Sequence, residues 1–308
     1  MTGAARVGFA GPGAVLIAAA VWGTSGTAAA LLPQVSPLTV GSLTLAVSGV
    51  VLAATAARGV GGLLRQRSAW PLLIVSAGAL AIYILAFFAG MALAGVALGT
   101  VVAIASSPLF VQAIETAVGR SWPAPRWLVA AVVTLIGVVL LVGGRVGEDG
   151  PGSSLVGGVS LALIAGLAYA VFTVGTARLL RRADVHGVGV PDRAVIGAVQ
   201  LLTVVPLLVV AIIAGVPKVD DVAAWGVLLY IGLVPTAVGY LLYTRGLARV
   251  SAATAALLTL LEPVVAAVLA AVLLDQRLSV VGWTGIVVTL LGLALAALPA
   301  QRRAATIR

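Results

Sequence analysis

One carboxyl group stands deep inside a long apolar stretch, where an ionisable side chain is costly and usually functional. Glu262 lies near the middle of residues 251–274, and Pro263 follows it directly. Proline lacks a backbone N–H and therefore frees a carbonyl group one turn earlier in a helix. A carboxyl group beside a helix kink at mid-membrane depth is the arrangement expected of a substrate or coupling-ion site. The alternative is a protonated, structural Glu262 that holds a neighbouring helix by a hydrogen bond.

Polar and aromatic residues inside other apolar stretches are candidates for the rest of such a site. Ser107 precedes a second proline, Pro108, so we expect kinks at both Pro108 and Pro263. A cavity with apolar and aromatic walls and few polar groups suits a small organic solute. Each candidate residue could instead contribute only to helix packing. The candidate wall residues are Trp22, Tyr83, Ser107, Tyr169, Gln200, Tyr240 and Glu262.

The chain lacks the residue combinations that most enzymes and metalloproteins require. It has no cysteine and a single histidine, His186, which falls in a predicted loop and makes no metal site alone. There is no Gly-x-x-x-x-Gly-Lys loop to hold a nucleotide phosphate. We therefore expect no catalytic residues, no metal and no cofactor, and no transport driven by ATP hydrolysis in this chain alone.

The composition indicates a polytopic membrane protein rather than a soluble one. Hydrophobic residues make up 62% of the chain, charged residues only 9%, and the mean hydropathy is +1.21. A membrane-spanning helix needs about 20 mainly apolar residues. Ten stretches of the chain meet this length. They lack the alternation of polar and apolar residues that is typical of barrel strands, so they predict an all-α fold of ten transmembrane helices. They are 13–32, 37–57, 70–92, 96–118, 127–144, 155–180, 194–215, 224–247, 251–274 and 280–300.

A repeated phrase divides the chain into two halves. Val-Val-Thr-Leu-Ile-Gly at 132–137 returns 155 positions later as Val-Val-Thr-Leu-Leu-Gly at 287–292. The same offset pairs Ser107-Pro108 with Glu262-Pro263. Five spans per half make the second half enter the membrane upside down, which predicts two inverted repeats around a central site. The predicted units are a tail 1–12, a repeat 13–145, a repeat 155–300 and a tail 301–308.

The positive charges set the predicted orientation. With the N-terminus inside, 15 of the 18 Lys and Arg fall in cytoplasmic segments, and only Arg145, Lys218 and Arg277 lie outside. This asymmetry predicts a multi-pass protein of a bacterial cytoplasmic (inner) membrane with both termini cytoplasmic. The net charge of +9 sits in short inter-helix clusters without interleaved aromatic residues, so no nucleic acid is expected as a partner. The expected partners are a small-molecule solute and the lipid bilayer, and a monomer is compatible with the sequence.

Several segments together resemble the EamA-type members of the drug/metabolite transporter superfamily. They are Leu16–Ala30 with Trp22-Gly23, the run from Leu260 through Glu262-Pro263 to Asp275-Gln276-Arg277-Leu278, and the two Val-Val-Thr-Leu-x-Gly helices. The resemblance covers about residues 13–300. It implies ten helices in two inverted repeats, with a cavity lined by the first, third, fourth, sixth, eighth and ninth helices. Two features depart from the family pattern: Gly119-Arg120-Ser121 replaces an acidic residue in the first half, and Ser42 lies where a basic residue is frequent.

Together these features predict a secondary transporter that exports amino acids, metabolites or drugs by alternating access around a mid-membrane cavity. Glu262 is the expected proton-coupling group. The alternatives are an uncoupled facilitator of the same solutes, a membrane-embedded enzyme acting on lipid, and a non-transporting accessory or signalling membrane protein. The absence of a catalytic constellation argues against the enzyme.

Overall fold

The computed structural model describes residues 3–119, 122–144, 154–185, 190–213, 222–273 and 276–298, and in these ranges it contains only helices and their connections. Ten segments are long and apolar enough to cross a membrane. Their bounds agree with the predicted stretches to within a few residues. The first helix differs most, because it begins at Gly3 and continues through the residues predicted as an N-terminal tail.

The first half contributes five spans and one short corner. Its spans are α1 (Gly3–Ala29), α2 (Pro37–Thr55), α4 (Trp70–Ala94), α5 (Val96–Ala117) and α6 (Pro125–Gly143). Between α2 and α4 lie a nine-residue helix, α3 (Ala57–Arg65), and a 3₁₀ turn, η1 (Arg67–Ala69). The corner is amphipathic, with Val60 and Leu63 buried against the bundle.

In the second half, two of the five spans are interrupted. The continuous spans are α7 (Leu155–Val185), α8 (Asp192–Ile213) and α13 (Val280–Ala297). The eighth span is built from α9 (Val222–Ile231), a π-helical segment η2 (Gly232–Val238) and α10 (Gly239–Leu247). The ninth is built from α11 (Ala252–Leu258) and α12 (Leu261–Leu273).

Serine residues fix the start of four of these helices. The side chains of Ser36, Ser154, Ser251 and Ser279 each accept the backbone N–H three residues later, at 3.1, 3.3, 3.1 and 3.2 Å. Such N-caps satisfy one of the amide groups that a helix start leaves free. At α2, Pro37 also occupies the first helical turn, where its missing N–H costs nothing.

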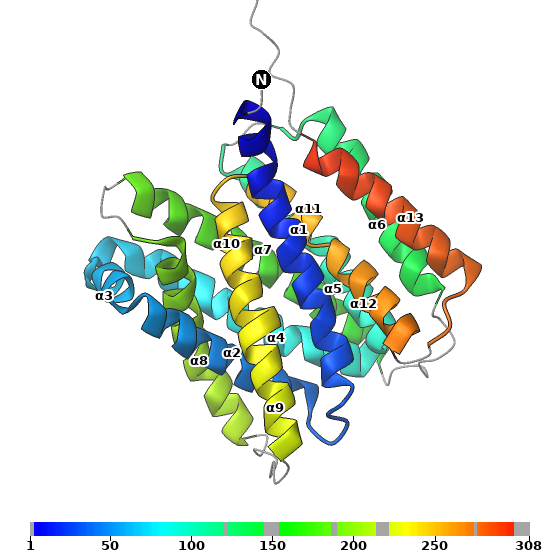
Figure 1. The fold of residues 1–308 in the computed structure, drawn as a ribbon, viewed down its shortest axis with the longest axis horizontal. Helices are drawn as coiled ribbons and strands as arrows, with labels where there is room; N and C mark the ends of the chain where they lie inside the picture. Colours follow the sequence, from blue (N-terminus) through cyan, green and yellow to red (C-terminus); the bar gives the residue numbers. More distant parts are fainter. Residues whose placement is uncertain are drawn as a thin grey trace, which may run out of the picture.

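The contacts between the two halves are symmetric: a contact made by a helix of one half is also made by the equivalent helix of the other half. Helix α4 packs along α7, as α1 packs along η2 and α10, and α5 crosses α7 much as α1 crosses α12. Equivalent spans meet directly in three places: α2 against α8, α5 against α11, and α6 against α13. In Figure 1, α6 and α13 lie side by side as a pair at one edge, and α1 runs beside α10 and α12.

The α6–α13 pair is where the repeated phrase packs against its own copy. A Cβ atom on Gly137 would collide with Thr289, and a Cβ atom on Gly292 would collide with Thr134. Both threonine hydroxyls are bonded within their own helices, to backbone carbonyls at 2.7 and 2.8 Å. Close backbone approach across small residues is the usual way for membrane helices to associate. The phrase that revealed the repeat is thus a contact between the halves, which we name the glycine seam.

Candidate functional site

A cavity lies between the two halves at mid-bundle depth. It holds about 650 Å³ of free space, including its open side. Its walls come from α1, α4, α5, α7, the η2–α10 region and the α11–α12 region, which are the six spans that the family resemblance implied. The lining residues are Trp22, Ser25, Tyr83, Ala103, Ile104, Ser107, Tyr169, Pro235, Thr236, Tyr240, Thr259 and Glu262.

Pro263 breaks the ninth span beside this cavity. Helix α11 ends at Leu258, and α12 begins at Leu261, with a tight turn between them. The carbonyl of Thr259 would normally accept an N–H from residue 263, which proline lacks. It accepts the backbone N–H of Glu262 instead, at 2.9 Å. The break therefore leaves its own backbone satisfied and places Glu262 in the first turn of a new helix.

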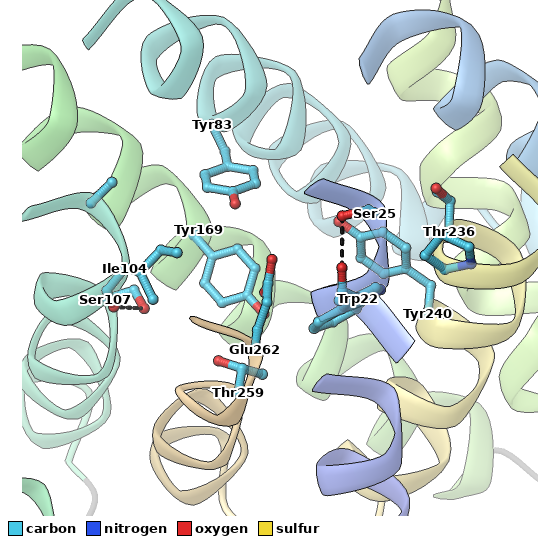
Figure 2. Close-up of a pocket in the computed structure, with 12 residues that line it drawn as sticks. Trp22, Ser25, Tyr83, Ile104, Ser107, Tyr169, Thr236, Tyr240, Thr259 and Glu262 are labelled. Atoms are coloured by element: carbon cyan, nitrogen blue, oxygen red, sulfur yellow. Dashed lines mark hydrogen bonds between the residues drawn. The ribbon is translucent and has the colours of Figure 1, made fainter. Parts of the chain in front are cut away.

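Pro108 acts differently at the equivalent place in the first half. Helix α5 runs through Pro108 without a break. The carbonyl of Ile104, which loses its regular donor, accepts the hydroxyl of Ser107 at 2.9 Å. Figure 2 shows this bond at the cavity wall.

The eighth span contains a third proline at the cavity, which our sequence analysis did not single out. Pro235 lies in η2, and the hydroxyl of Thr236 donates to the freed carbonyl of Ile231 at 2.7 Å. A polar residue next to a proline inside an apolar stretch was the signal available for this site, as at Ser107 and Glu262. Local π-helical geometry of this kind is frequent at functional sites.

Aromatic rings form one continuous cluster along the wall. The ring centroids of Trp22 and Tyr240 are 5.0 Å apart in an edge-to-face arrangement, and those of Tyr83 and Tyr169 are 5.1 Å apart. Phe172 joins the two pairs, at 5.8 Å from Tyr169 and 6.0 Å from Tyr240. Offset and edge-to-face arrangements at these distances are the ones that aromatic pairs prefer.

Two glycines allow α1 to pack closely against the helices that carry Tyr240 and Glu262. A Cβ atom on Gly239 would collide with the indole ring of Trp22. A Cβ atom on Gly23 would lie 2.7 Å from the Cβ of Val265 and 2.9 Å from the carbonyl oxygen of Glu262. Helix α1 therefore approaches both α10 and α12 at the level of Glu262.

Glu262 is the one charged residue among the described residues that line the cavity. Figure 2 shows its carboxyl group between Tyr169 and Trp22. Within the part of the chain that the structure describes, this carboxyl group has no hydrogen-bond or ion-pair partner. An acceptor that is free on the protein side can take a proton, a cation or an N–H or O–H group of a solute.

The cavity opens toward the face of the bundle opposite to the N-terminus. A wider vestibule of about 1580 Å³, including its open part, shares Trp22, Ser25, Ile104, Thr236 and Glu262 with it. The vestibule is further lined by the ends of the first five spans that lie opposite to the N-terminus, and by Gln276 beyond α12. The residues at those ends are Ala29, Val40, Met91, Val96 and Val142.

At the face that contains the N-terminal part of α1, the described residues of α1 and α10 pack tightly. A Cβ atom on Gly11 would lie 2.8 Å from the Cβ of Arg249, and one on Gly246 would collide with Val15. Deeper in, Tyr243 is fully buried and shares a hydrogen bond of 3.0 Å with Thr173. Among the described residues, the route to Glu262 therefore runs from the opposite face, through the vestibule.

The structure brings together most of the predicted wall residues. Six line the cavity: Trp22, Tyr83, Ser107, Tyr169, Tyr240 and Glu262. Gln200 lies elsewhere, fully buried between α8 and α2, where its Oε1 accepts the hydroxyl of Ser48 at 2.7 Å. We therefore leave Gln200 out of the candidate site. The predicted loop residues His186 and Asp275 lie outside the described residues.

Sequence reasoning missed three hydroxyl groups that line the cavity, those of Ser25, Thr236 and Thr259. Each donates to a carbonyl one turn or so earlier, at 2.6, 2.7 and 2.7 Å. Serine and threonine are common in membrane helices, so their residue type alone does not mark them.

Known proteins place this architecture in a family. The sequence model of the EamA-like transporter family matches the chain twice, at residues 10–143 and 156–298. A Bacillus subtilis protein, the uncharacterized transporter YwfM, is 33% identical over 296 residues, which cover 94% of this chain and 95% of the relative. An uncharacterized transporter of Clostridium kluyveri is 30% identical over 169 residues, 54% of this chain and 52% of the relative.

A solved crystal structure shows the same fold at low sequence identity. It superposes with a TM-score of 0.78 at 24% identity and covers 94% of this chain and 97% of its own. The double match covers both halves, each of which contains five of the ten spans. The chain belongs to the EamA-like transporter family of the drug/metabolite transporter superfamily.

Proposed function

We propose that this transporter exports small organic solutes across the cytoplasmic membrane by alternating access, with Glu262 as the group that exchanges a proton for the solute. The observation that carries the proposal is the carboxyl group of Glu262, which has no partner among the described residues and lies in a cavity that opens toward one face of the bundle. A carrier must expose its site to one side at a time, and related halves that exchange roles can do so.

The predicted orientation gives this conformation a direction. The open face lies at the ends of the spans opposite to the N-terminus of α1. If the N-terminus is cytoplasmic, as the positive charges predict, the structure corresponds to the outward-facing state, from which an exporter releases solute and takes up a proton.

The wall chemistry favours a solute with a cationic or amino group and an apolar or aromatic body. Rings of Trp22, Tyr83, Tyr169 and Tyr240 can stack on an aromatic body and attract a cation through their faces. Glu262 would pair with the amino group. No basic side chain occurs among the described lining residues, so a solute carboxylate would find no cationic partner there.

The alternative of a structural Glu262 receives no support from its contacts. That role needs a hydrogen bond from Glu262 to a neighbouring helix, and the described residues provide none. An uncoupled facilitator stays the competing function, because a cavity of this shape would serve it equally well.

Flux in proteoliposomes separates the coupled carrier from the facilitator. We expect a proton gradient to drive the accumulation of tryptamine, and tryptophan, which adds a carboxylate, to be taken up at least about tenfold more slowly. Glu262→Gln keeps the size of the side chain but cannot titrate. We expect this variant to fold and bind tryptamine, and to lose most uphill flux together with its pH dependence.

Thr259→Ser is the matched control on the same turn, because it keeps the hydroxyl group. A Gln variant that still concentrates tryptamine with an unchanged response to pH would remove Glu262 from the coupling mechanism. Solute flux that only equilibrates in the unaltered protein would make it a facilitator.

The orientation has its own test. We expect reporters that are active only in the periplasm to be silent when fused after Arg303 and active when fused at Gly150. The opposite pattern would reverse the assignment of the open face and make this conformation the inward-facing state.

A further inference from the structure

A second cavity has its own set of lining residues, at the corner where α2 ends, α3 follows and α8 begins. It has about 1050 Å³ of free space, including its open part, and shares no lining residue with the cavity at Glu262 or with its vestibule. It lies at the predicted cytoplasmic end of the bundle, because α2 ends and α8 starts there.

Two guanidinium groups line this corner cavity, those of Arg58 and Arg193. The start of α3 touches the start of α8, since a Cβ atom on Gly59 would lie 2.8 Å from the Cβ of Ala194 and 3.1 Å from the Cδ of Pro191. Each arginine is therefore adjacent in sequence to a residue of this contact.

The positive charges at the corner have no partner among the residues that the structure describes. Arg58 and Arg193 are exposed and make no hydrogen bond or ion pair with any described residue. Among the described residues, no acidic side chain lines the cavity, and Asp192, in the first turn of α8, is not part of its wall. Two like charges held at one cavity repel each other unless an anion lies between them.

The backbone adds to this preference. Helices α3 and α8 both begin at the cavity. The first amides of a helix lack intrahelical acceptors and carry a partial positive charge. They are therefore an accessory to the two guanidinium groups, which supply the geometry that matches phosphate oxygens.

The surroundings of the corner fit a lipid better than a soluble molecule. Val60 and Leu63 hold α3 against the bundle, whereas Arg58 and Arg65 face outward, as in a helix that lies at a membrane interface. Below the cavity, Val50 and Ala54 are exposed one turn apart on α2, which gives an acyl chain an apolar track away from the arginines.

We propose that the corner cavity binds a phosphate group, supplied by an anionic phospholipid of the cytoplasmic leaflet, with Arg58 and Arg193 as its ligands. The phosphate lies between the two guanidinium groups, and one acyl chain follows α2. The site is separate from solute transport and does not rest on the function proposed above.

The lack of cysteine in this chain gives a direct assay. Gly62 lines the cavity, and a Cβ atom there meets nothing within 4 Å, so Gly62→Cys introduces a single thiol without a clash. The labelling rate of this thiol by a maleimide is measured on the full chain in detergent, with phosphatidylglycerol, phosphatidylcholine or inorganic phosphate added. We expect phosphatidylglycerol to slow labelling about tenfold and the other two to change it less than about twofold.

The arginines are tested in the same Gly62→Cys background. Arg58→Gln with Arg193→Gln should abolish protection by phosphatidylglycerol. Arg249→Gln, which removes a charge from the same end of the bundle outside the cavity, should leave it intact. If the double Gln variant does not fold, Arg58→Lys with Arg193→Lys keeps both charges and should still weaken protection, because lysine lacks the guanidinium fork.

Equal protection by phosphatidylglycerol and phosphatidylcholine, or protection that persists without both arginines, would overturn the site. Arginine-dependent protection by inorganic phosphate alone would overturn the lipid as the source and make the ligand a soluble phosphate compound.

Discussion

The two halves place a polar residue and a proline at equivalent positions and use them differently. In the first half, Ser107 donates its hydroxyl to the carbonyl that Pro108 frees, and α5 stays continuous. In the second half, a backbone N–H satisfies the carbonyl that Pro263 frees, and the span breaks. The side chain of Glu262 is therefore not needed to satisfy this carbonyl, and its carboxyl group is available to a ligand.

The glycine seam shows the opposite behaviour, because there the halves are alike. Gly137 packs on Thr289 and Gly292 packs on Thr134, in reciprocal contacts. Arg126 adds a one-sided link, donating to the carbonyl of Leu295 at 3.0 and 2.7 Å. The repeat is therefore retained where the halves touch, and it has diverged where they face the cavity.

Removing the two prolines in turn is the strongest way to test the difference between the halves. Pro263→Ala restores a backbone N–H, favours a continuous ninth span and displaces Glu262. We expect transport of tryptamine in proteoliposomes to fall about tenfold or more, since small displacements of a reacting group are costly. Pro108→Ala should change it less than about twofold, because α5 is already continuous. Equal losses from both would show that the break has no special role.

The glycine seam should respond equally from either side. We expect Gly137→Ala and Gly292→Ala each to lower the free energy of unfolding by about 1–3 kcal/mol through overpacking. Gly143→Ala on the same helix is the control, since a Cβ atom there meets nothing within 4 Å. Unfolding of the purified variants in detergent measures all three. A clear difference between Gly137 and Gly292 would break the symmetry inferred for the seam.

The smallest effect is expected at Ser107. Ser107→Ala leaves the carbonyl of Ile104 without a donor, at a cost of about 1 kcal/mol in the unfolding free energy. Ser106→Ala is the matched control, because its acceptor, the carbonyl of Ala103, keeps a regular helical N–H donor. If both variants unfold alike, the hydroxyl of Ser107 is free to bind solute instead.

Long-range order was predictable from the sequence where it depends on apolar length and repetition. The ten spans follow from hydropathy, and the pairing of α6 with α13 agrees with the repeated phrase. The position of Glu262 at the cavity was predictable, because a carboxyl group inside an apolar stretch is costly unless it faces a polar site. The aromatic candidates line the cavity because large rings inside these helices pack at the centre.

Features set by side-chain direction were not predictable. Gln200 is an amide inside an apolar stretch like the other candidates, but its position on α8 turns it toward Ser48. The π-helical segment at Pro235 depends on a hydrogen bond to Thr236 that no periodicity records. The corner helix α3 is too short and too weakly apolar to be detected as an element.

The seam also imposes an order on folding during synthesis. Helices α6 and α13 are the last spans of their halves, so the contact between Gly137 and Thr289 cannot form until the final helix has entered the membrane. The contacts of α1 with α10 and α12 likewise cannot form until the second half has been synthesised. Chains fold from the N-terminus as they are made. The first half must therefore persist in the bilayer as an intermediate with unpaired glycine faces, which the last span covers.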